Sequence, residues 1–502
     1  MRSKLQAVLF TFLPLVVFAQ EQKTGSIDEK INDIFAPIVE FFGKIIFFEP
    51  FKFIGFDMPF IVLWLIVGAV FFTIKFNFVN FTGMKHAIEL IRGVYDDPNE
   101  PGEVSHFQAL VTALSGTVGL GNIAGVAVAV SLGGAGATFW MIVAGLIGMS
   151  SKFLECTLGV KYRKINAEGE VSGGPMYYLS EGLGKMGFKN LGKVLAVVFA
   201  VLCVGGSFGG GNMFQANQSF AQVVYIFPTF EGKGFWYGII ISIFVGAVII
   251  GGIKKIASVT DKIVPFMVIL YVLSCLFIIG ADISNIGNAF SQIWNGAFSP
   301  DGIAGGFMGV LIMGFRRAAF SNEAGVGSAA IAHAAVKTDE PVTEGFVALL
   351  EPFVDTVIIC TMTALVLIFT GYADNSSGLE GSALTSKAFS SVLPWFKYVL
   401  LVAIVLFAFS TMISWSYYGM KAWTYLFGNN KYMENLYKVL FLVFTVIGAS
   451  SSLGVVMDFS DMMVLAMAVP NIVGLYFLSS EVRRDLADYM RRLKKGEIAK
   501  FK

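Results

Sequence analysis

Charged side chains are scarce in this sequence. Asp, Glu, Lys and Arg make up 14% of the 502 residues, whereas a soluble domain carries about 25%. Hydrophobic residues make up 56%, and the mean hydropathy is +0.72. Apolar runs of about eighteen residues or more, long enough to cross a bilayer as helices, recur along the chain. The composition therefore excludes a soluble globular domain and predicts an all-α polytopic membrane protein.

Cysteine and histidine are also scarce, and neither forms a motif. The four cysteines lie in apolar segments without CxxC spacing and the three histidines are scattered, at Cys156, Cys203, Cys275, Cys360, His86, His106 and His333. Such spacing predicts neither a disulfide framework nor a metal site. A metal-dependent membrane enzyme is therefore disfavoured. The formal net charge of +1 indicates no class of partner.

Residues 1–20 have the layout of a secretory signal peptide. Arg2 and Lys4 precede an apolar stretch that ends at Phe18, and Ala19 follows it. A charged start, a short apolar core and a small residue before the cut are typical of a cleaved leader. We expect cleavage near Ala19, which leaves the mature N terminus outside; an uncleaved first helix is the alternative.

A series of transmembrane spans follows an amphipathic segment. Within 21–56, apolar residues recur at helical spacing, which predicts a helix lying in the outer membrane interface. The basic segment 481–502 is predicted to be a cytoplasmic tail, solvated or on the membrane surface. Between these segments we predict eleven spans, at 58–78, 107–132, 137–160, 194–226, 236–253, 262–281, 303–333, 343–371, 394–427, 434–457 and 460–480.

Basic residues indicate how the spans are oriented. With the mature N terminus outside, the loops on the cytoplasmic side hold many basic residues, such as Lys161, Arg163 and Lys164. The opposite loops hold few, Lys233 and Lys387. Because lysine and arginine are concentrated in cytoplasmic loops, the sequence predicts an external N terminus and a cytoplasmic C terminus.

Glycines interrupt the span 107–132. The stretch from Ser115 to Val126 contains Gly116, Gly119, Gly121 and Gly125. Each glycine costs about 1 kcal/mol relative to alanine inside a helix, and lipid offers no replacement hydrogen bonds. We predict a broken helix whose exposed N–H groups bind an anion and whose freed carbonyls bind a cation, and Asn122 in the same turn favours this reading. Close helix packing through small residues is the alternative.

A second interrupted span lies five spans further on. The span 303–333 carries Arg316, Arg317, Asn322 and Glu323 among apolar residues. Ionisable side chains within a membrane usually face a cavity or a partner. A break is therefore expected here too, beside the glycines that follow Glu323.

The positions of the two breaks divide the predicted transporter domain, 57–480, into parts. One extra helix at 58–78 precedes two sets of five spans, and each set begins with an interrupted helix. An odd number of spans makes the two sets run in opposite directions. We predict inverted repeats at 107–281 and 303–480 with a site near the bilayer midplane.

Four more ionisable residues lie in predicted spans. Glu351 and Asp355 are four residues apart and therefore share a helix face, while Lys152 and Glu155 lie in the span 137–160. We favour a structural role in which these side chains neutralise one another in a buried polar network. A role in coupling or gating is the alternative.

Hydroxyl and amide side chains cluster in two other spans. Ser410 and Thr411 offer two adjacent oxygen ligands to a small cation, and Trp415 lies one turn further along the Thr411 face. Gln215 and Gln218 share a helix face and could bind the amine of a zwitterion. Buried hydroxyls more often bond a carbonyl one turn back, and amides can simply join helices, so both structural alternatives stay open.

Four longer motifs carry a family resemblance. They are Thr-Val-Gly-Leu-Gly-Asn-Ile-Ala-Gly at 117–125, Gly-Gly-Pro-Met-Tyr-Tyr at 173–178, Phe-Ser-Asn-Glu-Ala-Gly-Val-Gly-Ser at 320–328 and Trp-Ser-Tyr-Tyr-Gly at 415–419. With these motifs in this order, the chain resembles the alanine or glycine:cation symporters over nearly all of residues 58–480. The resemblance implies a LeuT-like bundle of five plus five inverted-repeat helices, preceded by one extra helix.

The resemblance also implies residues for two sites. Sodium would bind the carbonyls of Ser115 and Val118 and the hydroxyls of Ser410 and Thr411. The substrate would bind Gly119, Gly121, Asn122, Gln215 and Trp415, with Leu120 and Phe320 completing the wall around its side chain. Leu120 stands where many family members have Thr, which implies a smaller and less polar pocket. Arg-Arg-Ala-Ala at 316–319 replaces one Arg followed by Gly, which leaves the geometry of the second break open.

The sequence thus predicts a secondary active symporter in the cytoplasmic (inner) membrane of a bacterium. Its expected partners are a small neutral amino acid, alanine or glycine first, the sodium ion and the lipid bilayer. Neither nucleic acid nor a cofactor besides the coupling ion is expected. The alternatives are a proton-coupled carrier of the same substrates and an amino-acid sensor with a transporter fold. A passive channel is disfavoured, because polar residues are confined to a few spans.

Overall fold

The computed structural model of the protein describes residues 27–50, 52–54, 58–97, 99–298, 306–373 and 378–501. The regular elements of the described chain are helices, except for one short antiparallel pair, β1 (Lys164–Ile165) with β2 (Val171–Ser172), and an isolated bridge between Val104 and Val336. In the pair, Lys164 lies opposite Ser172. The predicted all-α class is confirmed. The predicted signal peptide at 1–20 lies outside the described residues.

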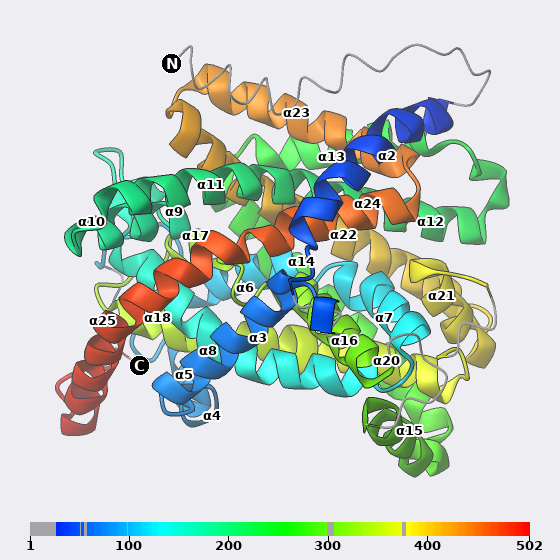
Figure 1. Ribbon diagram of the computed structural model, residues 1–502, viewed down its shortest axis with the longest axis horizontal. Helices are drawn as coiled ribbons and strands as arrows, with labels where there is room; N and C mark the ends of the chain where they lie inside the picture. The colour runs from blue at the N-terminus through cyan, green and yellow to red at the C-terminus, as the bar shows by residue number, and fades with distance from the viewer. Residues whose placement is uncertain are drawn as a thin grey trace.

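An amphipathic helix and an apolar helix precede the first break. Phe35 and Val39 of the amphipathic helix α2 are buried, while Phe41 and Ile45 are exposed, as suits a helix at a membrane interface. Figure 1 shows α2 lying across α24 (Leu453–Ala466). The elements of this part are α2 (Ile27–Ile46), η2 (Lys52–Ile54), α3 (Phe60–Lys75), α4 (Val79–Thr82) and α5 (Met84–Ile91).

The segment predicted as the first repeat forms a series of long helices with short connecting turns. Its elements are α6 (His106–Thr117), η3 (Gly121–Gly125), α7 (Val126–Gly133), α8 (Ala137–Lys161), α9 (Pro175–Tyr177), η4 (Tyr178–Gly182), α10 (Leu183–Lys185), α11 (Lys189–Phe208), η5 (Gly209–Met213), α12 (Phe214–Ile226), η6 (Pro228–Phe230), α13 (Gly234–Ile249) and α14 (Gly252–Ala281). The segments η3, η4 and η5 are π-helical, a local geometry often found at functional sites.

The segment predicted as the second repeat has the same character. Its elements, after η7 (Ile283–Asn285) and α15 (Ile286–Phe298), are α16 (Gly306–Asn322), α17 (Ala329–His333), α18 (Pro341–Ala348), α19 (Leu350–Pro352), η8 (Phe353–Cys360), α20 (Thr361–Phe369), α21 (Gly381–Val392), α22 (Phe396–Phe427), α23 (Lys431–Ser450), α24 and α25 (Ala468–Lys495). The π-helical η8 joins α19 to α20 within one span. The division of the chain into two repeats stays a prediction.

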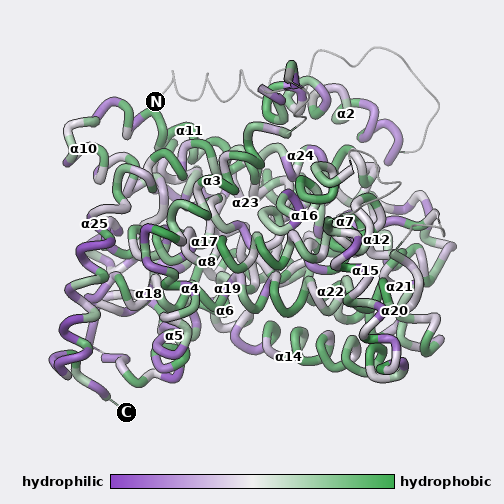
Figure 2. Tube along the Cα trace, turned by 60° about the horizontal axis from the view of Figure 1, so that its bottom comes forward, coloured by the Kyte–Doolittle hydropathy of each residue, from purple (hydrophilic) through white to green (hydrophobic). Residues whose placement is uncertain are grey.

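Apolar helices long enough to cross a bilayer make up most of the bundle. Within the described ranges there are seven, and up to eight if the bent pair of α6 with η3 and α7 counts as one. Two shorter apolar helices, α3 and α13, lie beside them. Figure 2 shows apolar residues throughout the bundle and hydrophilic residues along the last turns of α25. The number of eleven spans and the direction of the termini stay predictions.

The C-terminal segment is a helix that packs one side on the bundle, while most of its other residues are exposed or half-buried. α25 continues the last span up to Lys495 without a break. Tyr489 is fully buried, and its hydroxyl lies 2.7 Å from Nε2 of His86. Arg492 donates to both carboxylate oxygens of Glu340, at 2.5 and 2.7 Å. The sequence shows the amphipathic face of this segment but not the surface that it meets, which is the bundle itself.

α8 is the helix around which the buried polar residues are arranged. It packs against α3, α16, α17 and α18. Every side chain from Gly148 to Val160 is buried, so this half of α8 contacts protein on all sides instead of lipid. Lys152 and Glu155 lie in this stretch and therefore require polar partners.

Candidate functional site

The first predicted break is present, and it bends the helix sharply. α6 ends at Thr117, and its axis makes an angle of 51° with the half that begins at Gly121. At Val118 the backbone leaves the helical conformation, with ψ at 77°. A side chain at Gly119 would overlap the hydroxyl of Thr411, so only glycine allows α22 to approach this closely. The orphan carbonyls at the end of α6 therefore face α22.

The second break lies just after the arginine pair. α16 stays helical through Asn322, and the chain then takes positive φ values at Glu323 (56°), Gly325 (85°) and Gly327 (92°) before α17 begins. The Asn322 side chain accepts a hydrogen bond from the backbone N–H of Ala324 at 2.9 Å. A positive φ is uncommon for a residue with a side chain and is found most often where surroundings hold it for function.

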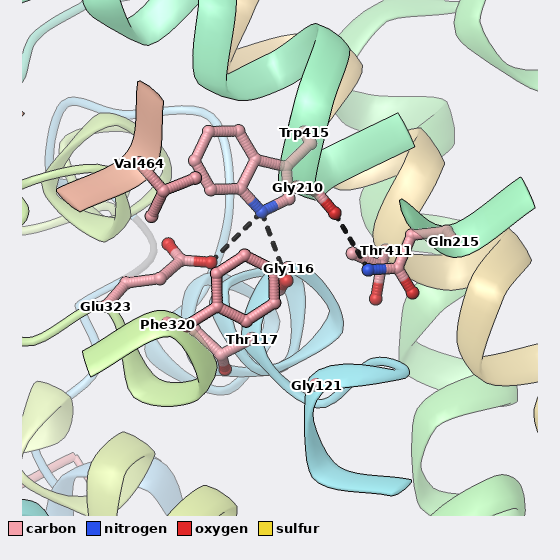
Figure 3. Close-up of a pocket in the computed structure, with 10 residues that line it drawn as sticks. All are labelled: Gly116, Thr117, Gly121, Gly210, Gln215, Phe320, Glu323, Thr411, Trp415 and Val464. Carbon is pink, nitrogen blue, oxygen red and sulfur yellow. Dashed lines mark hydrogen bonds between the residues drawn. The ribbon is translucent and has the colours of Figure 1, made fainter. Parts of the chain in front are cut away.

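A small cavity lies between the two breaks (Figure 3). Its volume of about 10 Å³ is close to the space that one water molecule needs. An amino acid is larger, so the surrounding helices must separate to admit one. The residues that line it come from both breaks, from η5 and α12, from α22 and from α24: Gly116, Thr117, Gly121, Phe320, Glu323, Gly210, Gln215, Thr411, Trp415 and Val464.

Trp415 joins the two breaks. Its indole N–H donates to the carbonyl of Gly116 at 3.2 Å and to Oε1 of Glu323 at 3.0 Å, as Figure 3 shows. The other carboxylate oxygen of Glu323 accepts from the hydroxyl of Ser328. The ring lies directly on Gly211, where any side chain would overlap it, which explains one glycine of the Gly-Gly-Gly stretch. Trp415 is thus placed to respond to movement of either break.

Three of the predicted sodium ligands form hydrogen bonds between α6 and α22. The hydroxyl of Thr411 donates to the carbonyl of Ser115 at 3.0 Å, and the hydroxyl of Ser115 donates to the carbonyl of Ser410 at 2.7 Å. The hydroxyl of Ser410 instead donates to Phe407, one turn back on its own helix, at 3.0 Å. The Ser115 carbonyl and the Thr411 hydroxyl therefore lie together, whereas the Ser410 hydroxyl is engaged elsewhere.

The predicted amide ligands differ in where they point. Oε1 of Gln215 accepts from the N–H of Leu120 at 3.0 Å, which brings this side chain to the first break beside the cavity. Asn122 turns away from the cavity: its Oδ1 accepts from the N–H of Gly119 at 2.9 Å, and its Nδ2 lies 2.5 Å from Oδ1 of Asp355. Gln218 bonds to the backbone N–H of Ser382 at 3.0 Å and does not line the cavity.

The cavity contains residues that sequence reasoning did not assign to the site. Glu323 had a signal, since it is a carboxylate beside two glycines in an apolar span. Gly210 lies in a run of three glycines, which is a weaker signal. Gly116 and Thr117 belong to the first break but were not named as ligands. Val464 had no signal, because an apolar residue in an apolar helix is indistinguishable from its neighbours.

Of the four ionisable residues expected to neutralise one another, two form an ion pair and two bond to neutral side chains. Lys152 bonds to Glu351, with Nζ and Oε1 2.9 Å apart, while Glu155 accepts from Asn471 at 2.7 Å. Asp355 accepts from the hydroxyl of Ser321 at 2.9 Å as well as from Asn122, so its carboxylate ties the two breaks together. Glu351 and Asp355 share no partner, because the π-helical η8 begins between them and shifts the phase of the helix.

The arginine pair lies on the other side of the second break. Nε of Arg316 is 2.8 Å from Oδ2 of Asp461, and Arg317 bonds to the same oxygen. The guanidinium of Arg316 also lies over the ring of Phe47, 4.4 Å from its centroid. The pair is thus held by α24 and by the segment that follows α2, at the edge of the site instead of in it.

Comparisons with known proteins agree on the family. The profile of the sodium:alanine symporter family matches residues 47–502. The sodium/alanine symporter AgcS of Methanococcus maripaludis is 41% identical over 427 residues, which cover 84% of this chain and 92% of that protein. The probable sodium/glutamine symporter GlnT of Bacillus subtilis is 34% identical over 443 residues, covering 88% and 90% of the two chains.

A solved structure shows the fold. MhsT, solved in complex with L-phenylalanine, superimposes with a TM-score of 0.50 over 74% of this chain and 89% of that chain, at 15% sequence identity. The chain therefore has the LeuT-type transporter fold, as the resemblance implied. The family profile and the sequence relatives identify the chain as a member of the sodium:alanine symporter family, and the fold agrees with them.

Proposed function

We propose that this protein carries small neutral amino acids, alanine or glycine first, into the cell together with sodium. As a member of a symporter family it is a multi-pass membrane transporter and not an enzyme, and the family uses sodium as its coupling ion. The observation that carries the narrower proposal is the small cavity between the two breaks, walled by Trp415 and Phe320. When the helices separate to admit a substrate, these two aromatic rings would face its side chain and exclude a large one.

The charged ends of the substrate would bind backbone. Gly121 lines the cavity at the start of the second half-helix, where the helix dipole favours a carboxylate. The amine would bind oxygen atoms on the opposite side, from the end of α6 and from Gln215. In this assignment Asn122 holds the break in shape through Gly119 and Asp355, and Leu120 supports it from the buried side.

Sodium would bind beside the substrate at the end of α6. The carbonyls of Ser115 and Val118 and the hydroxyl of Thr411 offer the hard oxygen ligands that sodium prefers, and Ser410 would join them if its hydroxyl leaves Phe407. Ion and substrate would then stabilise the same arrangement of the first break. The coupling free energy between them must be reciprocal, so each ligand strengthens binding of the other.

Transport would follow from movement of one helix set against the other around this site. We propose eleven spans with the two inverted repeats at 107–281 and 303–480, an external N terminus and a location in the inner membrane. On this orientation the end of α25 is cytoplasmic. Inward sodium flow then drives amino-acid uptake.

Uptake into liposomes tests the function directly. Purified protein in proteoliposomes should accumulate labelled alanine when sodium is high outside, and an imposed proton gradient without sodium should not replace it. Accumulation driven by the proton gradient alone would favour the proton-coupled alternative. Alanine binding without any uptake would favour a sensor.

Trp415 is expected to set selectivity. Trp415→Ala should weaken the binding of alanine and glycine. The binding of valine or leucine should improve relative to them by about tenfold or more, since one methylene in an apolar pocket is worth about 1–3 kcal/mol. Competition of each amino acid against labelled alanine measures this. Trp415→Phe is the matched control, because it keeps a ring but loses the bonds to Gly116 and Glu323. If Trp415→Ala weakens all competitors by one factor, Trp415 is a packing residue.

A further inference from the structure

The histidines that are scattered in the sequence meet at one end of the bundle. His106 and His333 both bond to Glu344, from opposite sides: Nδ1 of His333 is 2.5 Å from Oε1, and Nδ1 of His106 bonds to Oε2. All three side chains are buried, with side-chain exposures of 3% or less. His86 lies near this end as well but bonds to Tyr489. Glu344 is therefore a carboxylate shared by two imidazoles inside the protein.

The buried group formed by His106, Glu344 and His333 continues toward the cavity through Glu351 and Lys152, which we count as part of it. Nε2 of His333 lies 3.5 Å from Oε2 of Glu351, and Oε1 of Glu351 accepts from Lys152 at 2.9 Å. Lys152 in turn interacts electrostatically with Glu323, which lines the cavity and bonds to Trp415. Acidic and basic groups thus alternate from the edge of the site to His106.

The other end of the group approaches the protein surface. Nε2 of His106 lies 4.0 Å from Oδ1 of Asp96, whose side chain is 37% exposed. This surface is the face on which the C-terminal end lies, since the N–H of Phe501 bonds to the carbonyl of Val94 at 2.8 Å. A proton released by His106 would therefore reach water on the face that bears the end of the chain.

Charge balance favours one extra proton in this group. Lys152, Glu351 and Glu344 sum to one negative charge when both imidazoles are neutral, and to zero when His106 and His333 share one proton. Because an unbalanced charge is costly in a buried site, the group should hold that proton as long as no cation is bound at the first break. The other titratable or charged groups facing it are Asp96, Glu100, Glu155, Cys156, Arg163, Glu323, Asp339 and Tyr418.

Two atoms of the group lack a hydrogen bond. Within the described residues, Nε2 of His333 and Oε2 of Glu351 are buried without a hydrogen-bond partner, since the 3.5 Å between them is too long for a good one. A network that serves only to stabilise the fold usually satisfies all its buried polar atoms. A network that gains and loses a proton must leave some of them unsatisfied in one of its states.

We propose that His106, Glu344 and His333 hold one exchangeable proton, which leaves toward Asp96 when a cation binds at the first break. With the exchangeable proton bound, both imidazoles donate from Nδ1 to Glu344, and His106 also carries a proton on Nε2. When the cation binds, the Nε2–H bond of His106 breaks and its proton passes to water beside Asp96. Both imidazoles end neutral and keep their Nδ1 protons, Glu344 remains a carboxylate, and one proton has left. The proton is thus a third ligand, linked to occupancy of the site through Glu323 and Lys152.

Linkage gives this proposal a measurable sign. It rests on the proposed function in that the cation is sodium. If sodium binding releases one proton, protons must oppose sodium binding by the same free energy. The half-saturating sodium concentration should then fall about tenfold for each pH unit over the range in which the proton is released.

The test is a sodium titration of alanine binding by purified protein between pH 6 and 8, with choline keeping the ionic strength constant. Wild type should show the roughly tenfold dependence per pH unit. His333→Gln combined with Glu344→Gln keeps hydrogen-bonding side chains and a net charge of zero with Lys152 and Glu351, and it should be nearly independent of pH. His86→Gln is the matched control and should behave as wild type. A pH-independent wild type, or a double variant that keeps the dependence, would overturn the proposal.

A second measurement does not depend on the variant folding. Because the chain has three histidines, nitrogen NMR of ¹⁵N-histidine-labelled protein can follow each ring. Sodium chloride with alanine should remove one proton from the His106 and His333 pair and leave His86 unchanged; no change in the pair overturns the proposal. If alanine binding needs no sodium at any pH, the proposed function fails, and the spectra still decide whether the pair holds a shared proton.

Discussion

Replacing Gly121 by valine is expected to abolish binding and uptake of every amino acid while leaving the protein folded. Gly121 lines the cavity, and its φ is not positive, so the backbone accepts a side chain. An added Cβ would lie 3.5 Å from Phe320 Cδ1 and from Ser321 Cα, which is ordinary contact. The γ carbons of valine have no such room, because the cavity measures about 10 Å³. They would occupy the place proposed for the carboxylate, which all amino acids share.

Gly121→Ala is the matched control for this prediction. Its single methyl group fits the contacts just described and should reduce alanine and glycine binding by a similar and much smaller factor, since both substrates share the carboxylate that it approaches. Equilibrium binding of labelled alanine and glycine to purified protein gives both results, and a thermal melt shows that each variant is folded. If the Gly121→Val variant still binds alanine, the carboxylate does not bind beside Gly121.

The two helix breaks are the part of the fold that the sequence predicts best. Glycine in a membrane helix has a local cost and a local consequence, so the positions of Gly119 and Gly121 are enough to locate the bend of 51°. The second break was expected near Glu323, and the structure has it there, after α16 runs helically through the unusual arginine pair. Local rules succeed here because the cause lies in the chain itself.

Contacts between residues that lie far apart in the chain could not be predicted from the sequence. The sequence pattern did not indicate which acidic residue Lys152 pairs with, and the structure pairs it with Glu351, 199 residues away. Glu351 and Asp355 were expected on one face, but a π-helical segment that the pattern does not announce separates them. Which residues fill the space between helices depends on packing of the whole bundle, and Val464 entered the cavity for that reason.

Only some of the predicted ligand residues line the cavity. Gly121, Gln215, Phe320, Thr411 and Trp415 all line the cavity, because each lies at a break or on a helix face that the breaks approach. Asn122 lies at the break as expected but uses its side chain to hold Asp355. A sequence motif gives the position of a residue along the chain, and the direction of its side chain is fixed only when the neighbouring helix is present. The ligand roles stay predictions that substitutions can test.

Removing the hydroxyl of Thr411 is expected to raise the sodium concentration for half-maximal uptake by about ten- to a hundredfold. A hydrogen-bonding contact with a charged group contributes about 1.5–3 kcal/mol, and each 1.4 kcal/mol corresponds to about a factor of ten. The Thr411 hydroxyl lies 3.0 Å from the carbonyl of Ser115, so a cation between α6 and α22 would meet both oxygens. Thr411→Ala should also weaken alanine binding at low sodium, because the coupling is reciprocal.

Two further substitutions separate a sodium ligand from a packing residue at this position. Thr411→Ser keeps the hydroxyl and should stay near wild type in sodium dependence, although it loses the methyl group. Ser410→Ala should have a smaller effect than Thr411→Ala, since the Ser410 hydroxyl bonds to Phe407 and must be released before it can bind an ion. Alanine uptake into proteoliposomes at varied external sodium measures all three. Unchanged sodium dependence in a folded double alanine variant of Ser410 and Thr411 would remove both from the ion site.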